Sequence, residues 1–280
     1  MDQSRCKRLD GGAKQGKTIT VNRKARAFAV SVIDQHRYLP AAVTLLFAPG
    51  QRPDAQAIYQ QTAAEGQAMP FSVSLCPDPG SPWLELLAMG LTYDLSGLAV
   101  AAPAPLPKVA HRFGLDQADF AVDLEAVRIV PGPLITSNRV MMPVIRVLAG
   151  LAAELIALPG LRAVIWDAAN SAMAPEYFYT AVQGWLRGGP FPAFGLTGFT
   201  RQNDGTLQSH GFALFTGYEV AIAVLPNEDP ADHARFAARI INQLIQADGD
   251  SFAELHDTAG LRITTQFDPV TKVLLARRLA

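Results

Sequence analysis

The fold is decided by residues 190–225, which read PFPAFGLTGFTRQNDGTLQSHGFALFTGYEVAIAVL. Glycines recur through strand-like sequence in this segment, and the turn-forming residues 202–205 (QNDG) separate two apolar runs. An Asp-Gly pair between such runs is a strong hairpin signal. We therefore expect a meander of three strands, over residues 193–201, 206–214 and 218–224.

Outside the meander, short apolar strands alternate with longer helical patterns. Residues 83–100 predict a hairpin that turns at residues 94–97, and residues 111–122 are expected to hold a short helix. The longest helix is expected between Ser137 and Pro159, because its apolar residues keep a 3.6-residue period. Further strands are expected at residues 41–47, 71–75, 124–130, 161–166, 260–266 and 271–277, and further helices at 54–65, 175–187 and 229–248.

This order of elements predicts an α+β fold. We expect mixed, mainly antiparallel sheets with helices packed on one face, including ferredoxin-like β-α-β-β elements. Residues 1–37 are interpreted as a basic, largely disordered arm, residues 38–135 as an N-terminal α+β half and residues 136–280 as a C-terminal α+β half. The two halves could form one compact domain. A chain of 280 residues buries enough surface to be stable without disulfides or a structural metal.

Composition restricts the environment in which the chain can work. Hydrophobic residues make up 49% and charged residues 18% of the sequence. The longest apolar run, residues 140–158, contains a proline, an arginine and a glutamate, whereas a membrane span needs about 20 nearly uncharged residues. The two cysteines, Cys6 and Cys76, form no CxxC pattern. We therefore expect free thiols, a cytoplasmic location and no membrane partner.

Positive charge is concentrated at the start of the chain. Residues 1–37 hold nine Lys and Arg against three Asp and Glu, whereas the remainder holds 15 against 22. Such an arm can attract nucleic acid or anionic surfaces non-specifically. Aromatic residues do not alternate with the basic residues before Phe28. Nucleic-acid binding is therefore not expected, except through this arm.

Several residues follow one another in a recognisable order between residues 151 and 280. They are Val164-Ile165-Trp166, Pro175, Phe178, Asp204-Gly205, Ser209, Gly211-Phe212, Phe215, Gly217, Glu219 and Asp248-Gly249-Asp250. In order and spacing they resemble domain-of-unknown-function family 4261, from which the chain departs at Thr216 and Ser251. The resemblance implies a bacterial α+β domain, and it implies no catalytic residue.

Glu219, His210 and Asp167 are the candidate catalytic residues. Glu219 is a lone acid in an apolar strand, so it is either a surface acid, a cap on backbone N–H groups at the Gly217 turn, or a general acid/base in a pocket. His210 lies on the preceding strand, and pairing about the turn is expected to place it opposite a position three or four beyond Glu219. Asp167 ends the strand of residues 161–166 and could complete a hydrolase-like or metal-assisted site.

Other chemical motifs are missing from the sequence. The five histidines, at positions 36, 111, 210, 233 and 256, show neither HxxxH nor HExxH spacing. The chain also contains no G-x-S-x-G element, phosphate loop or dinucleotide fingerprint. We therefore expect no metal ligands and no cofactor, and the sequence indicates no particular small molecule.

Seven aromatic residues lie between positions 166 and 194: Trp166, Tyr177, Phe178, Tyr179, Trp185, Phe191 and Phe194. Their helical spacing favours core packing between a helix and a sheet. The alternative is a binding groove in which an exposed Tyr177 or Tyr179, beside Trp185, anchors a partner protein. Arg187 lies next to two glycines and could hold an anion, although glycines that end a helix explain the same pattern.

The favoured function is that of a non-catalytic domain that binds a protein partner or associates with itself. Its candidate binding residues are Trp166, Tyr177, Tyr179, Trp185 and Arg187. The alternative is a hydrolase-like or metal-assisted enzyme with a site built around Glu219, His210 and Asp167.

Overall fold

The computed structural model describes residues 41–78, 80–116, 123–133, 135, 141–223, 229–247, 255–256 and 262–278. All of them belong to one compact unit, Tyr38–Ala280. The predicted basic arm at residues 1–37 lies outside the described residues. So do the predicted start of the longest helix and the second half of the predicted helix at residues 111–122.

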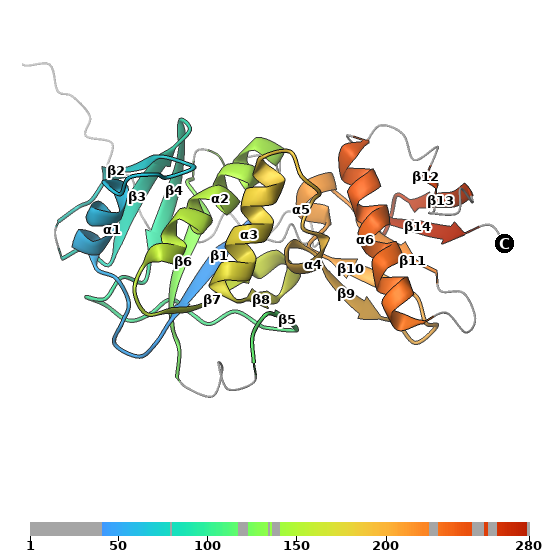
Figure 1. Ribbon diagram of the computed structural model, residues 1–280, viewed down its shortest axis with the longest axis horizontal. Coiled ribbons are helices and arrows are strands. Elements are labelled where there is room, and N and C mark those ends of the chain that lie inside the picture. Colours follow the sequence, from blue (N-terminus) through green and yellow to red (C-terminus); the bar gives the residue numbers. More distant parts are fainter. Residues whose placement is uncertain are drawn as a thin grey trace, which may run out of the picture. The chain divides into compact units, whose positions relative to one another are not determined.

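The first sheet has eight strands within the described part of the chain, in the order β2-β3-β4-β6-β1-β7-β8-β5 (Figure 1). Neighbouring strands are antiparallel except for β5 and β8, which run parallel. The strands are β1 (Val43–Phe47), β2 (Phe71–Leu75), β3 (Trp83–Ala88), β4 (Leu91–Ser96), β5 (His111–Phe113), β6 (Glu125–Pro131), β7 (Leu161–Trp166) and β8 (Ser171–Met173). The predicted boundary at residues 135 and 136 falls between strands that share this sheet.

Helices α2 (Met142–Glu154) and α3 (Pro175–Leu186) pack against one face of the first sheet and against each other (Figure 1). Strand β1 is buried along its whole length, as expected of a continuous apolar run covered on both faces. On the other face a smaller apolar cluster is completed by residues from the connector after β4. The cluster contains Leu46, Ala126, Ala163, Ile165 and Ala172, with Ala104, Val109, Leu115 and Leu124 against it.

The second sheet follows the order β12-β13-β14-β11-β10-β9 within the described residues. Its strands are β9 (Gly198–Arg201), β10 (Leu207–His210), β11 (Glu219–Ile222), β12 (Leu255–His256), β13 (Arg262–Asp268) and β14 (Val273–Arg278). Helix α6 (Pro230–Gln246) lies against this sheet in Figure 1, and the guanidinium of Arg278 in β14 lies 3.7 Å from the ring centroid of Phe236 in α6. Asp229 caps α6 by accepting a hydrogen bond from the backbone N–H of Ala231.

These two mixed, mainly antiparallel sheets and their helices confirm the predicted α+β class. The β-α-β-β order also occurs at the start of the chain, where β1 is followed by α1 (Ala55–Thr62), β2 and β3. However, β1 lies in the middle of the sheet and β2 at its edge.

One predicted turn is wrong, and one predicted helix is wrong at its first three residues. The β3–β4 hairpin turns at Met89 and Gly90, whose φ angles are 50° and 77°, and not at residues 94–97. Two successive positive φ angles form the tight turn that matches the twist of a hairpin, and Asp94 instead pairs with both neighbouring strands. Likewise His111 begins a strand, because it pairs in parallel with Ser171 of β8.

Short helices interrupt the predicted meander. Helix α4 (Ala193–Leu196) precedes β9, and helix α5 (Ala213–Thr216) separates β10 from β11. The hairpin of β9 and β10 is confirmed, with Leu207 opposite Arg201. Strands β8 and β12 were not predicted, because runs of three and two residues are too short for a periodic signal.

Helix α2 begins at Met142, with Pro143 in its first turn, where the missing N–H of proline would have no partner in any case. A short 3-10 turn, η3 (Leu155–Ala157), extends it. None of the helices within the described ranges has the length and apolar character that crossing a membrane needs.

Candidate functional site

Glu219 caps backbone N–H groups, as one interpretation of the sequence predicts, but at the turn before α5 and not at Gly217. Its carboxylate accepts hydrogen bonds from the Ser209 hydroxyl (2.5 Å) and from the backbone N–H groups of Gly211 (2.8 Å), Phe212 (3.2 Å) and Ala213 (3.2 Å). These four bonds satisfy both carboxylate oxygens. Glu219 is therefore fully engaged in holding the β10–α5–β11 connection together.

The Ser209 hydroxyl of β10 makes two hydrogen bonds to β11. It donates to Glu219 and accepts from the backbone N–H of Val220 at 2.7 Å. Ladder pairing of β10 with β11 covers only Leu207 with Ile222 and Gln208 with Ala221, and the Ser209 hydroxyl supplies a contact beyond it. The Ser209 hydroxyl thus uses its donor and one acceptor function in structural contacts.

His210 approaches a histidine of the other sheet. If the β10–β11 register is continued beyond its paired residues, His210 lies opposite Glu219. The predicted partner of His210, a residue three or four positions after Glu219, is therefore wrong. Burial lowers the pKa of His111, and the neighbouring His210 lowers it further. Gly198, which pairs with His210, leaves the space for this approach, since a Cβ on it would lie 2.6 Å from Cδ2 of His111.

Asp167 belongs to a polar network on the first sheet. It lies in a 3-10 turn, η4 (Asp167–Ala169), directly after β7. One carboxylate oxygen accepts from the Thr44 hydroxyl at 2.9 Å, and the other lies 2.9 Å from the guanidinium of Arg128. Burial raises the pKa of Asp167, although Arg128 and Thr44 oppose the increase.

The structure does not join the three candidate catalytic residues into one network. Within the described residues, no hydrogen bond or ion pair connects any two of the Glu219, His210 and Asp167 side chains. The two carboxylates are occupied by separate structural contacts, and His210 faces another histidine. The enzyme alternative stays a prediction that none of these contacts favours.

A groove of about 690 Å³ lies beside α3. Its lining residues come from α3, from the segment that follows it and from α6, which lies about fifty residues further along the chain. They are Glu176, Tyr177, Thr180, Ala181, Gly184 and Trp185 from α3, residues 190–194, and Ala238 and Asn242 from α6.

Helix α3 contributes two small residues, Ala181 and Gly184, and two aromatic residues, Tyr177 and Trp185, to the lining of this groove. Pro175 occupies the first helical position, where its fixed φ suits the helix. Phe178 and Val182 face the core and are fully buried, so Tyr177, Ala181 and Gly184, at i, i+4 and i+7, share the groove face. Small side chains at the last two positions leave the groove open.

The second wall of the groove is held by aromatic contacts and by α6. The ring of Phe191 packs edge-on against Trp185, with centroids 5.4 Å apart, and against Phe215, at 4.8 Å. The backbone N–H of Phe191 donates to the Asn242 side chain of α6 at 2.7 Å. This wall is thereby fixed in place before any ligand arrives.

Tyr177 presents a rigid aromatic surface at the rim. Its side chain remains 37% exposed, yet its ring stacks on Phe113 at 5.8 Å and its hydroxyl donates to the carbonyl of Phe194 at 3.3 Å. Burial raises the pKa of Tyr177, so the hydroxyl remains a neutral donor. Glu176 is the single charged residue among the described residues that line the groove.

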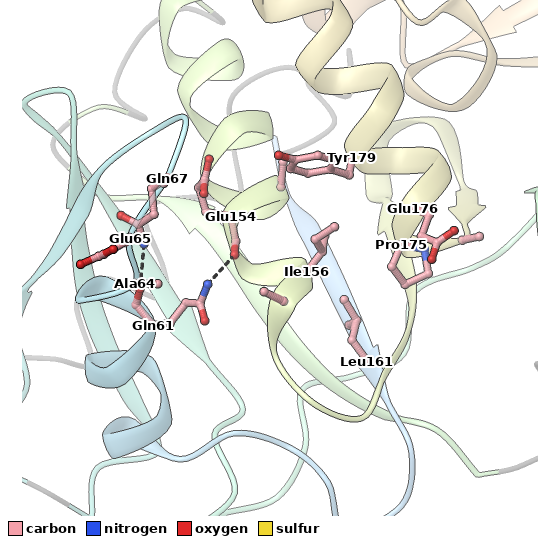
Figure 2. Close-up of a pocket in the computed structure, with 14 residues that line it drawn as sticks. Gln61, Ala64, Glu65, Gln67, Glu154, Ile156, Leu161, Pro175, Glu176 and Tyr179 are labelled. Carbon is pink, nitrogen blue, oxygen red and sulfur yellow. Dashed lines mark hydrogen bonds between the residues drawn. The ribbon is translucent and has the colours of Figure 1, made fainter.

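The other three predicted binding residues, Trp166, Tyr179 and Arg187, do not line this groove. Trp166 is completely buried and stacks on Phe215 at 6.1 Å, so it is a core residue, as helical and sheet spacing favoured. Tyr179 is 37% exposed but lines a different pocket (Figure 2). Arg187 is exposed at the C-cap of α3 and lines neither pocket.

The sequence pointed to Tyr177 and Trp185, but other groove residues were missed. Ala181 and Gly184 could have been found, because they lie at helical spacing from Tyr177. Asn242 could not, because its place beside Phe191 depends on packing between segments about fifty residues apart in sequence.

The chain matches no family model, no curated protein and no solved structure. The resemblance to domain-of-unknown-function family 4261 therefore stays a prediction.

Proposed function

We propose that this chain is a non-catalytic protein-binding domain, and that the groove beside α3 receives an extended segment of a partner protein. The observation that carries this proposal is the groove itself, a preformed apolar hollow with an exposed tyrosine at its rim. Exposed but immobilised aromatic residues beside a pocket are the usual anchors of protein interfaces.

The size and chemistry of the groove support a peptide as the occupant. A volume of about 690 Å³ falls in the range of ligand pockets, about 300–1,000 Å³. Trp185, Phe191 and Phe194 give it apolar walls, while Thr180 and Asn242 add polar groups that can bond a backbone. A peptide with one or two large apolar side chains matches this combination.

The same groove offers little to a chemical reaction. A catalytic site needs titratable groups placed around the reacting atoms. Among the described lining residues Glu176 and Tyr177 are titratable, and the Tyr177 hydroxyl already donates to the carbonyl of Phe194. We also propose a cytoplasmic location, which the partly exposed free thiol of Cys76 supports.

Gly184→Arg provides the sharpest test of the groove. A Cβ at this helical position meets nothing within 4 Å, so the substitution fits the fold. Replacing a helical glycine with arginine should add up to about 1 kcal/mol of stability, while the new side chain occupies the groove. The variant should therefore be at least as stable as the wild type and should lose peptide binding.

The experiment selects peptides from a displayed random library on the wild-type chain, on Gly184→Arg and on Ala63→Arg. Ala63 is exposed at the end of α1 and does not line the groove, so Ala63→Arg controls for the added charge. Wild type and Ala63→Arg should enrich the same peptides, rich in aromatic and large aliphatic residues, and Gly184→Arg should not. Enrichment of the same peptides by Gly184→Arg would overturn the proposal.

A further inference from the structure

A second pocket, of about 680 Å³, lies where the end of α1, the end of α2 and the start of α3 meet (Figure 2). It is a different hollow from the peptide groove, although Glu176 borders both. Its lining consists of Gln61, Ala64, Glu65, Gly66, Gln67, Ala153, Glu154, Ile156, Ala157, Leu161, Ala174, Pro175, Glu176 and Tyr179.

The charge of this pocket has one sign. Glu65, Glu154 and Glu176 place three carboxylates around it, and among the described lining residues none is Lys, Arg or His. Exposed acids alone would say little, because surface carboxylates are normally solvated. Glu65 and Glu176 are of this exposed kind. The informative residue is Glu154.

Glu154 is a buried carboxylate without a cationic partner. Its side chain belongs to a residue that is only 8% exposed. One carboxylate oxygen accepts a hydrogen bond from the backbone N–H of Met69 at 2.9 Å, and within the described residues the other has no hydrogen bond and the group has no ion pair. The unbonded oxygen belongs to a carboxylate that lies beside a hollow and has no counter-charge in the described part of the chain, and a bound cation would supply that counter-charge.

The remaining walls suit a hydrocarbon chain attached to that cation. Ile156, Leu161 and Pro175 give apolar surface (Figure 2). Figure 2 also shows the ring of Tyr179 extending from α3 toward Glu154, and a tyrosine ring attracts a nearby ammonium group. A bare metal ion fits less well, because the described residues contain no group of three or more side chains placed to hold one.

We propose that this pocket binds a primary alkylammonium group, with Glu154 as its buried counter-charge and the apolar walls around its aliphatic chain. A lysine side chain of another protein and a free aliphatic amine share this chemistry. The proposal is independent of the peptide groove, because it rests on different residues apart from Glu176.

The test titrates the full chain with n-pentylamine at neutral pH and follows backbone amide signals by NMR. The uncharged isostere 1-pentanol serves as the control ligand. Glu154→Gln is the informative variant, because the amide oxygen can still accept from Met69 while the charge is gone. Glu85→Gln removes one negative charge outside the pocket and serves as the control variant.

Pentylammonium should perturb signals around this pocket, and 1-pentanol should bind at least about tenfold more weakly. Glu154→Gln should weaken pentylammonium binding by at least about tenfold, whereas Glu85→Gln should leave it unchanged. Ala157→Trp, at an exposed position on the rim, should weaken it as well without removing any charge.

Nα-acetyl-lysine N-methylamide distinguishes the two sources of the cation. Tighter binding of this compound than of pentylammonium assigns the pocket to a lysine side chain, and equal or weaker binding assigns it to a free amine. Equal affinity of wild type and Glu154→Gln for pentylammonium overturns the proposal, and so does equal binding of 1-pentanol and pentylammonium.

Discussion

The Glu219 carboxylate accepts one hydroxyl and three backbone hydrogen bonds. From the sequence, Glu219 could be a surface acid, a cap on backbone N–H groups or a general acid/base, because it stands alone among apolar residues. The structure shows why an acid is needed for the fold: three successive backbone N–H groups converge at the start of α5 and require a strong acceptor.

Glu219→Gln should therefore destabilise the protein. The amide group of glutamine would place its own N–H donors against the backbone N–H donors that Glu219 now accepts from. We expect this change to lower the free energy of unfolding by about 2 kcal/mol. Glu65→Gln, at an exposed position, should change it by less than about 0.5 kcal/mol. Urea unfolding measures both values, and equal stability of Glu219→Gln and wild type would contradict the capping role.

Gly211 and Gly217 form a second comparison at this scale. Both have positive φ angles, 83° and 82°, so alanine at either position meets similar backbone strain of about 1 kcal/mol. A Cβ on Gly217 meets nothing within 4 Å, whereas a Cβ on Gly211 would lie 2.8 Å from the carbonyl carbon and oxygen of Ala168. Gly211 is thus required for a close approach between the two sheets.

Gly211→Ala should cost at least about 2 kcal/mol more than Gly217→Ala, because the backbone at Ala168 must move to admit the methyl group. Thermal or urea unfolding of the two variants measures this difference directly. Equal losses in the two variants would show that the sheets do not meet closely at Gly211.

At the scale of elements, the sequence predicted the helices and strands that depend on residues close together in the chain. The helix from Pro175 and the helix capped by Asp229 were both expected from proline and acid at their first positions, and β1 from its continuous apolar run. The Met89–Gly90 turn was missed, because methionine at a positive φ is uncommon. The strand at His111 was missed, because its parallel pairing with β8 depends on residues sixty positions away.

The same limit applies to the candidate sites. Tyr177 and Trp185 were expected to be near each other because they share one helix. The contributions of Asn242 to the groove and of Glu154 to the second pocket depend on contacts between distant segments. Sequence periodicity contains no information on such contacts, so these residues could not be placed beforehand.

At the scale of the whole molecule, one apolar core includes residues of both sheets. The ring of Trp166 at the end of β7 stacks on Phe215 of α5, and His111 of β5 lies against Gly198 of β9. The His111 contact contains a titratable pair, because His210 of β10 lies close enough to influence His111.

Stability should consequently fall in mildly acidic solution. Burial and His210 lower the pKa of His111 below its ordinary value of 6.5. Below pH 6.5, His111 is therefore protonated more readily in the unfolded chain than in the folded protein. The contribution of neutral His111 is fully present above pH 6.5 and is lost as the pH falls through its folded-state pKa. His111→Gln should show a smaller loss of unfolding free energy than wild type between about pH 7.5 and about pH 5.5.

His210→Gln provides the matched variant. Removing the second histidine should raise the pKa of His111 toward its ordinary value, so this variant should also lose less stability on acidification than wild type. Identical pH dependence in wild type, His111→Gln and His210→Gln would contradict this account of the junction.

The central claim is that the groove beside α3 binds a peptide, and its most direct test is the affinity of one selected peptide for three chains. Titration calorimetry should show that Gly184→Arg binds at least about tenfold more weakly than wild type, although it unfolds at no lower denaturant concentration. Ala63→Arg should bind like wild type. A Gly184→Arg chain that binds the peptide with wild-type affinity would show that the groove is not the binding site.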